Sequence, residues 1–208
     1  MRPENGLAGR ERRSFIEEAR RAQIVECAIE TIAAVGYTQA SLARIAAAAR
    51  ISKGVISYHF ADKDELIREV VSQVLKAFDS YMRPRIQAEC GSAAEMLRAY
   101  IASNVAFMGA HRGHVVVLME VFTNARRRDG KPVVDPEKYE SGLAELEQIL
   151  RKGQKAGEFR RFSPRVMAIS IRQAIDAIAP QMIENPKLDL DGYSRELTKL
   201  FELATRAD

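Results

Sequence analysis

The sequence lacks several features that mark secreted, membrane and disulfide-stabilised proteins. It has only two cysteines, Cys27 and Cys90, which are too far apart in the chain to form a close-spaced disulfide or metal-binding framework. No stretch reaches the roughly 18 uninterrupted apolar residues of a membrane span, and the N-terminal residues contain no apolar core of signal-peptide length. These absences predict a soluble, cytoplasmic protein whose thiols are reduced and buried.

The motifs of the common enzyme classes are also missing. There is no phosphate-binding glycine loop, no nucleophile elbow and no cysteine metal cluster. One alternative lies in "HRGH", where His111 and His114 are followed by Glu120, a spacing that could offer metal ligands. Nothing nearby supplies a further ligand or a catalytic base. The sequence therefore predicts neither an enzyme nor a bound metal or other cofactor.

The chain has a modest positive charge that is concentrated near its N-terminus. The net charge of the 208 residues is +4, and Met1–Lys63 contains 10 basic and 7 acidic residues. This excess is too small to prove a nucleic-acid partner, but a local basic surface does not need a large net charge. With 47% hydrophobic residues the chain can also bury a substantial core, in one or two domains.

Apolar residues recur with the period of an α-helix through most of the chain. The first helix is predicted over Ser14–Val35, because Gly36 follows where a helix commonly ends in a left-handed residue. A second, short helix is predicted from Ser41, and a third over Ser52–Phe60, since serine is a favoured N-cap residue. The N-terminal part is thus expected to contain three helices, the last two close together.

The rest of the chain also has a helical pattern. A fourth helix should begin at Asp62 and end at Arg83-Pro84, because proline lacks an amide proton. The segment "HVVVLMEVF" fits a buried strand equally well, but we assign it as helix because no second strand is available to pair with it. Breaks are expected at Gly91, Arg112-Gly113, residues 129–136, Gly157 and Asn185-Pro186. The prediction is an all-α chain of about nine helices.

Two short helices joined by a tight turn describe a helix-turn-helix when the second carries exposed polar residues near its N-terminus. The major groove of DNA admits one such helix, while the preceding helix contacts the phosphate backbone. Gly54 costs roughly 1 kcal/mol of helix propensity relative to alanine, but it allows close approach to the groove. The predicted DNA-binding residues are Ser41, Arg44, Ser52, Lys53, Gly54, Val55, Ser57, Tyr58, His59 and Lys63.

Several short motifs occur in a specific order between Gln23 and Val71. Gly-Tyr follows the first helix, "IAAAA" lies in the second, Ser-Lys-Gly opens the third, and Tyr-His-Phe precedes Lys-Asp-Glu-Leu. This segment resembles the DNA-binding domain of the tetracycline-repressor (TetR) family of transcriptional regulators, and Gly153–Asp176 more loosely resembles the entry into the family's dimerisation helix. The resemblance implies a DNA-binding domain in residues 1–65 and a larger helical ligand-binding and dimerisation domain in residues 66–208.

Two positions depart from the family's pattern. The family usually has glycine in the turn before the third helix, where this chain has Arg50. Because a left-handed backbone is disfavoured at other residues, either the turn differs slightly or Arg50 accepts the strain. Arg44 lies where an acid would complete a capping box with Ser41, and it either contacts a DNA phosphate or is solvated.

The resemblance also implies a function. A homodimeric repressor would place the third helix of each subunit in a major groove of a palindromic DNA operator, with half-sites about one helical turn, 34–36 Å, apart. A small-molecule effector would bind the C-terminal domain and release the DNA, which requires only different affinities for the two states. An architectural DNA-binding protein that responds to no ligand is the alternative.

The candidate effector-binding residues are aromatic residues and methionines at helical spacing, and polar residues that lie among apolar ones. Each of them also fits a plain core or surface position. They are Phe78, Met82, Tyr100, Asn104, Phe107, Met108, Glu120, Tyr139, Arg172 and Asp176.

The dimer interface is expected on two helices, Pro164–Met182 and Asp191–Ala207, which would form a four-helix contact with their symmetry mates. Its predicted residues, which could instead pack inside one subunit, are Ile171, Ile175, Ile178, Leu197, Leu200 and Phe201. The N-terminal residues 1–13 form either a mobile tail or an arm that enters a DNA minor groove with Arg10, Arg12 and Arg13.

Overall fold

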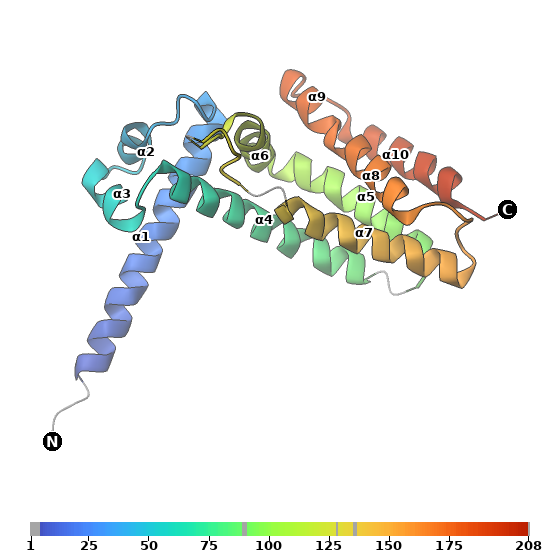
Figure 1. Ribbon diagram of the computed structural model, residues 1–208, viewed down its shortest axis with the longest axis horizontal. Coiled ribbons are helices and arrows are strands. Elements are labelled where there is room, and N and C mark those ends of the chain that lie inside the picture. The colour runs from blue at the N-terminus through green and yellow to red at the C-terminus, as the bar shows by residue number, and fades with distance from the viewer. Residues whose placement is uncertain (1–4, 89–90, 128, 135–136, 208) are drawn as a thin grey trace. The chain divides into compact units, whose positions relative to one another are not determined.

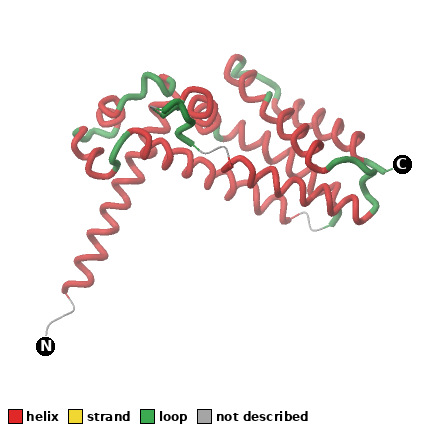
Figure 2. The backbone as a smooth tube through the Cα atoms, in the orientation of Figure 1, coloured by secondary structure: helices red, strands yellow, loops and turns green. Residues whose placement is uncertain are grey.

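The computed structural model describes residues 5–88, 91–127, 129–134 and 137–207, and within these ranges the side chains of all residues except 5–14 and 137–141. The described regular structure is helical apart from two isolated β-bridges (Figures 1 and 2), which confirms the all-α prediction. The helices in this part of the chain are α1 (Asn5–Val35), α2 (Leu42–Ala48), α3 (Lys53–His59), α4 (Lys63–Ala88), α5 (Ala93–Ala110), α6 (Arg112–Asn124), α7 (Glu137–Ala156), α8 (Pro164–Asp176), α9 (Ile178–Glu184) and α10 (Leu190–Thr205).

The chain forms two compact units. Unit 1 consists of Met1–Gln73 and Glu120–Val134, and unit 2 consists of Val74–Met119 and Asp135–Asp208. Two helices, α4 and α6, contribute residues to both units. The predicted division of the chain after residue 65 stays a prediction.

Unit 1 contains the three N-terminal helices that the sequence predicts. Ser41 and Ser52 are the N-caps of α2 and α3, and their hydroxyls accept the backbone N–H of Arg44 and Val55. Ile24, Ile45 and Ile56 contribute one fully buried side chain from each helix. Because α2 and α3 have only seven residues each, packing of such side chains rather than intrinsic helix propensity must hold them in place.

Two helices, α1 and α4, differ from their predicted lengths. Helix α1 begins at Asn5, nine residues before the predicted start at Ser14. Helix α4 begins after Asp62 as predicted, but its predicted end at Arg83-Pro84 is wrong, since the helix runs through Pro84 to Ala88. Met82 and Ile86, on either side of the proline, are buried in the core, and this packing outweighs the loss of one backbone hydrogen bond.

The thiols of the two cysteines were predicted to be reduced and buried. Cys27 on α1 is half-buried, and burial together with Glu30 and Glu26 raises the pKa of its thiol. The thiol is therefore protonated at neutral pH. Cys90 lies outside the described residues.

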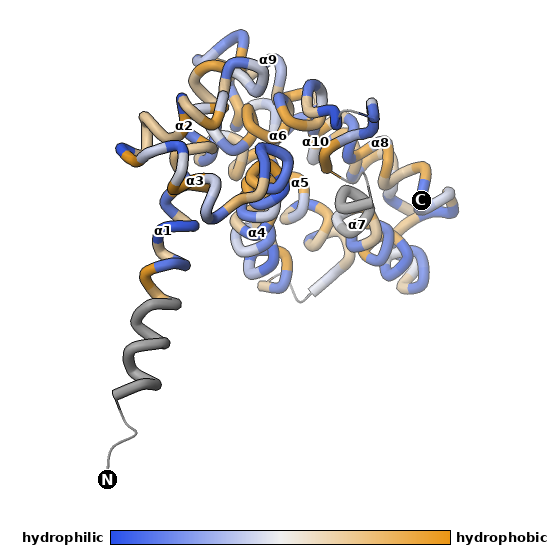
Figure 3. The backbone as a smooth tube through the Cα atoms, turned by 60° about the vertical axis from the view of Figure 1, so that its left-hand side comes forward, coloured by the Kyte–Doolittle hydropathy of each residue, from blue (hydrophilic) through white to orange (hydrophobic). Residues whose placement is uncertain are grey.

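Unit 2 has an apolar core, to which α4, α5, α6, α7, α8, α9 and α10 contribute. Figure 3 shows hydrophobic and hydrophilic stretches alternating along the helices, as expected for helices with one buried face. The "HVVVLMEVF" segment lies in α6, so its assignment as helix is confirmed. The break before α6 is at His111, which caps α5, one residue before the predicted position.

The predicted helix Pro164–Met182 is two helices, α8 and α9, which are separated at Ala177. Pro180 lies in the first turn of α9 and has no N–H to donate to the carbonyl of Asp176. Its ring also crowds that carbonyl, which explains why α8 ends at Asp176. Pro180 is visible in the sequence, but the long apolar pattern around it led to the prediction of one continuous helix.

Within the described ranges, no single helix is long and apolar enough to cross a membrane. The pair α5 and α6 passes this test only when the two are joined, and they are bent by 96° at their break.

Candidate functional site

The third helix presents most of its polar residues to solvent. Ile56 is fully buried, whereas Lys53, Gly54 and Ser57 are exposed and Tyr58 is 73% exposed. Of the remaining predicted DNA-binding residues, Ser41, Arg44 and Ser52 are also exposed, and Val55, His59 and Lys63 are half-buried. One apolar side chain thus anchors α3, and the first turn of the helix is open to a partner.

The turn between α2 and α3 contains a left-handed residue. Arg50 has φ 55°, and it is the non-glycine residue with a positive φ in the part of the chain that the structure describes. Its N–H donates to Ala47 O at 3.1 Å, and the N–H of Ile51 donates to Ala46 O at 3.0 Å. This pair of bonds is a Schellman motif, a helix end that favours glycine at the left-handed position. The turn therefore keeps the left-handed backbone at this position, and Arg50 accepts the strain, which costs about 1–2 kcal/mol.

The segment that contains α2 and α3 has no acidic residue. No Asp or Glu occurs between Glu30 and Asp62, and Arg44, Arg50 and Lys53 are exposed within this segment. None of these three side chains makes a hydrogen bond or an ion pair with any group that the structure describes. Their charges are therefore uncompensated at short range, as expected for a surface that meets a polyanion.

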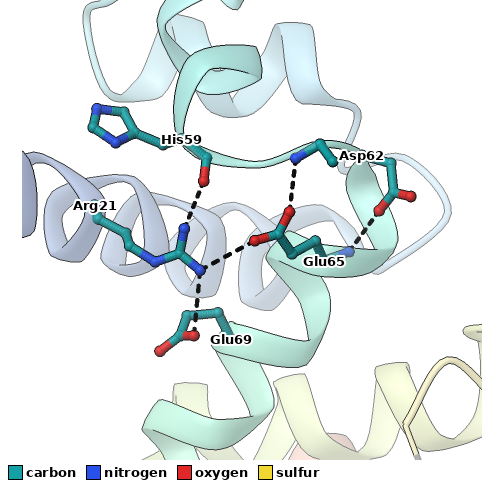
Figure 4. A network of polar contacts seen from close by, with 6 residues as sticks. Arg21, His59, Asp62, Glu65 and Glu69 are labelled. Atoms are coloured by element: carbon teal, nitrogen blue, oxygen red, sulfur yellow. Dashed lines mark hydrogen bonds and ion pairs between the residues drawn. The ribbon is translucent and has the colours of Figure 1, made fainter.

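A polar network fixes the C-terminal end of α3 (Figure 4). Arg21 on α1 donates to the backbone oxygen of His59 at 2.5 Å and forms ion pairs with Glu65 at 3.4 Å and Glu69 at 3.5 Å on α4. Its guanidinium also lies 4.1 Å from the ring centroid of Phe60. Arg21 thus satisfies a free carbonyl at the end of α3 and connects it to both neighbouring helices.

Glu65 completes this network through the first turn of α4. Its carboxylate accepts the N–H of Ala61 at 2.7 Å, and its own N–H donates to Asp62 Oδ1 at 2.7 Å. The hydrogen bond from Ala61, together with Arg21, lowers the pKa of Glu65 below its ordinary value. The carboxylate stays ionised at neutral pH, and this contribution to stability is lost only as the pH falls through the lowered pKa.

A second cluster in unit 1 holds the turn after α1. Glu120 accepts the N–H of Tyr37 at 2.9 Å and the side-chain amide of Asn124 at 3.1 Å. Gly36 has φ 78°, and a Cβ there would lie 3.1 Å from Glu120 Oε2. Lys63 donates to Tyr37 O at 2.8 Å and lies 4.1 Å from the centroid of its ring. We call Gly36, Tyr37, Lys63 and Glu120 the Tyr37 clamp.

The Tyr37 clamp contains two residues with a predicted binding role, Lys63 for DNA and Glu120 for the effector. Burial lowers the pKa of the Lys63 ammonium and raises the pKa of the Tyr37 hydroxyl, so the hydroxyl stays protonated at neutral pH. Lys63 lies in the clamp as well as beside the helix-turn-helix, and Glu120 has its hydrogen-bond partners within unit 1. A phosphate contact for Lys63 and an effector contact for Glu120 stay predictions.

Several predicted effector residues meet in unit 2. Arg172 pairs with Asp176 at 2.9 Å and donates to Asn104 Oδ1 at 3.2 Å, and Asn104 donates to the backbone oxygen of Tyr100 at 2.8 Å. Asn104 and Tyr100 are 1% and 2% exposed. The Tyr100 hydroxyl is buried, with no hydrogen-bond partner among the described groups. This polar network lies between α5 and α8 in an otherwise apolar core.

An aromatic cluster adjoins this network. The Phe78 ring lies 5.8 Å from the Arg172 guanidinium and packs edge-on against Phe107, with the ring centroids 5.1 Å apart. Phe107 stacks on His111 at 4.5 Å and also contacts Tyr81. Tyr81 and His111 were not among the predicted effector-binding residues, although His111 follows Phe107 by one helical turn. Met82 and Met108 are buried in the same core.

Three further observations concern the residues that were predicted to bind an effector or a metal ion. The side chain of Tyr139 lies outside the described residues. A surface hollow of about 550 Å³ on α7 is lined by other residues, namely Gln148, Arg151, Lys152, Lys155 and Ala156. His111 and His114 pack against one another at 5.3 Å, and the described residues contain no group of three or more His, Cys, Asp or Glu side chains placed to hold a metal ion.

The predicted dimer residues fall into two classes. Ile171, Ile175 and Ile178 are 0% exposed within the single chain, and Phe201 is 7% exposed, so these residues pack in the subunit's own core. Leu197 is half-buried and Leu200 is 55% exposed. Further large apolar side chains are exposed on the same two helices. We call the set Val166, Ile169, Leu200 and Leu203 the α8–α10 apolar face.

The N-terminal domain has recognisable relatives. Residues 24–70 match the family model described as "Bacterial regulatory proteins, tetR family". This segment of the chain is similar to the DNA-binding domain of the TetR family. The chain is 35% identical over 89 residues to the HTH-type transcriptional regulator BetI of Paraburkholderia phytofirmans, a match that covers 43% of this chain and 46% of BetI. It is 38% identical over 90 residues to BetI 1 of Chromohalobacter salexigens, covering 43% and 44%. The chain thus matches less than half the length of these relatives.

Solved structures of other proteins share the fold over most of the chain. FadR from Bacillus subtilis in complex with stearoyl-CoA has a TM-score of 0.74 at 23% identity, and the match covers 86% of this chain and 96% of FadR. AibR in complex with isovaleryl coenzyme A and operator DNA has a TM-score of 0.74 at 20% identity, covering 87% and 97%. FadR is named as a transcriptional regulator, and at such identities the likeness of both structures shows the fold alone.

Proposed function

We propose that the protein is a ligand-responsive transcriptional regulator that binds a palindromic DNA operator as a homodimer and is released by a small-molecule effector. The observation that carries the proposal is the exposed first turn of α3 within a segment that has no acidic residue. A seven-residue helix held by one buried isoleucine and by Arg21 at its end gives a fixed recognition element. Since operator DNA is in the cytoplasm of a bacterium, this function places the protein there.

In this proposal α3 enters the major groove and α2 lies along the phosphate backbone. Lys53 and Ser57 would reach base edges, since both are exposed near the start of α3. The free N–H groups at the N-termini of α2 and α3, together with Arg44, would contact phosphates. Tyr58 donates to Glu17 on α1 at 3.3 Å, an exposed hydrogen bond that a phosphate oxygen can replace at little cost.

The dimer would form through the α8–α10 apolar face. Four exposed large apolar side chains on two adjoining helices are costly in water and suit a self-complementary contact with a second copy. A dimer places two α3 helices on one operator, where the half-sites must be about one helical turn apart. This arrangement keeps the predicted pair of interface helices but uses their exposed side rather than the buried isoleucines.

The effector would bind in unit 2, beside Arg172, Asn104 and Tyr100. Three features of this network suit a largely apolar compound with an acceptor or anionic group: a guanidinium, a buried hydroxyl without a partner, and adjoining aromatic rings. Two structural neighbours are complexes with acyl-CoA thioesters, which are compounds of this kind. We therefore propose an acyl compound, free or as its CoA thioester, as the effector class.

The DNA-binding half of the proposal predicts an operator that depends on Lys53. Selection of genomic fragments bound by the protein at fixed salt should yield a palindrome, and Lys53→Ala should lower the affinity for it by about 10-fold or more, because a base contact contributes about 1–3 kcal/mol. Lys76→Ala, which removes an exposed lysine from α4 in unit 2, is the control and should bind normally. No enriched sequence, or equal binding by both variants, would refute this half.

The effector half predicts release of the selected operator by acyl compounds. Stearoyl-CoA, isovaleryl-CoA and the two free acids should be titrated into the protein–operator complex, and at least one should weaken it 5-fold or more, a typical allosteric coupling. Arg172→Met should abolish that response, whereas Arg161→Met, on an exposed loop, should keep it. If no compound changes the affinity, the architectural alternative is favoured; if Arg172→Met responds normally, the site lies elsewhere.

A further inference from the structure

Arg50 occupies a position that the fold alone would give to glycine. Its left-handed backbone completes the Schellman motif at the end of α2, and both hydrogen bonds of that motif are made by backbone atoms. A glycine would make the same two bonds without the clash between a Cβ and the neighbouring carbonyl. The Arg50 side chain therefore destabilises the folded state, and the backbone hydrogen bonds of the turn do not explain why an arginine is present.

The side chain of Arg50 contributes nothing to packing within unit 1. It is exposed, and it makes no hydrogen bond, ion pair or ring contact with any group that the structure describes. Arg21, by contrast, forms two ion pairs, donates to a backbone oxygen and stacks on Phe60. Strain that is maintained without an internal benefit is typical of residues that act on a ligand.

The position of Arg50 indicates which ligand that is. It lies two residues before Ser52, the N-cap of the helix that presents Lys53 and Ser57. Arg44 and Lys53 are exposed in the same segment, in which no carboxylate reduces the local positive potential. A planar guanidinium pairs with two oxygens of one phosphate, and it stays charged at any relevant pH.

We propose that Arg50 contacts a backbone phosphate of the operator, at the edge of the groove that α3 enters. This inference rests on the proposed DNA-binding function and adds to it a residue at the turn itself. The strained turn positions the guanidinium beside the start of α3, where phosphate contacts fix the register of the recognition helix. Because phosphates carry no sequence information, Arg50 would add affinity equally on all sequences.

The proposal predicts opposite changes in folding stability and DNA affinity when Arg50 becomes glycine. Arg50→Gly should raise the melting temperature by several degrees because the strain is relieved. The same variant should bind the operator about 5- to 10-fold more weakly at low salt, with a similar loss on non-specific DNA. The slope of log K against log salt should fall by about one, which is the loss of one phosphate contact.

Arg50→Lys is the matched control, because it keeps both the charge and the side-chain strain. It should melt near the wild type and should retain the salt slope, with at most a small loss of affinity. An Arg50→Gly protein that melts higher but keeps the wild-type affinity and salt slope would overturn the inference while leaving the proposed function intact. If the wild-type protein binds no DNA, both fail together. A loss confined to the operator, absent on non-specific DNA, would also overturn it and would make Arg50 a base contact.

Discussion

Replacing Leu200 and Leu203 by glutamate should convert a dimer into monomers and lower operator affinity by about 100-fold or more. The two leucines are 55% and 58% exposed on α10, so the single subunit should fold without them. In the proposed dimer their burial would place two carboxylates per subunit in an apolar contact, where unpaired charges are strongly unfavourable. The affinity falls because a monomer loses the effective concentration, which is typically worth a factor of about 10² to 10⁴.

Light scattering coupled to size exclusion at micromolar protein measures the first effect, and operator binding at fixed salt measures the second. Ile16→Glu is the control for adding charge to an exposed apolar position, because Ile16 is 57% exposed on α1 in unit 1. This control should remain dimeric. The proposed interface is excluded if the double variant stays dimeric, or if the wild-type protein is already a monomer under these conditions.

Truncating Ile56 to alanine should lower the free energy of unfolding of unit 1 by about 2–5 kcal/mol, the usual range for deleting a buried isoleucine. Ile56 is 0% exposed and is the buried residue of α3, so the cavity forms where the recognition helix contacts the rest of unit 1. Most domains are stable by only about 5–15 kcal/mol. The variant should therefore be close to unfolding at physiological temperature, with a matching loss of operator binding.

Chemical denaturation followed by circular dichroism tests the Ile56 prediction. Ser57→Ala is the control on the same helix: its side chain is exposed, and its unfolding free energy should stay within about 0.5 kcal/mol of the wild type. Ser57→Ala can still weaken operator binding through a lost base contact, which separates recognition from folding. An Ile56→Ala protein as stable as Ser57→Ala would mean that α3 is held by other contacts, with Arg21 the first to examine.

Local signals in the sequence predicted the starts of α2, α3 and α4 well. Ser41, Ser52 and Asp62 mark the starts of three helices because a cap depends on one side chain and the next few backbone amides. Arg50 was also visible as a departure from the family's glycine, but only the observed φ decides between a changed turn and a strained residue. Signals that act over a few residues can be read directly from the sequence.

Features that depend on tertiary packing were harder to predict. Pro84 has a strong local preference against helix, yet burial of Met82 and Ile86 keeps α4 continuous. Ile171 and Leu200 are both apolar residues on amphipathic helices, and only the fold shows that the first is buried in the subunit while the second is exposed. The association of Asn104 with Arg172 across 68 positions follows from the packing of α5 on α8, which no local pattern specifies.

Helix α6 belongs to both units, and the Tyr37 clamp gives this division a thermodynamic consequence. Its residues up to Met119 belong to unit 2, and from Glu120 onwards they belong to unit 1, where Glu120 holds the backbone of Tyr37 ahead of α2. An effector that binds a form of unit 2 with α6 displaced would have to break these hydrogen bonds, and their free energy would then enter the coupling between effector and DNA. Linkage is reciprocal, so operator DNA would weaken effector binding by the same factor. The strength of the Glu120–Tyr37 contact would therefore set how much effector is needed to empty an occupied operator, compared with the amount that saturates the free protein.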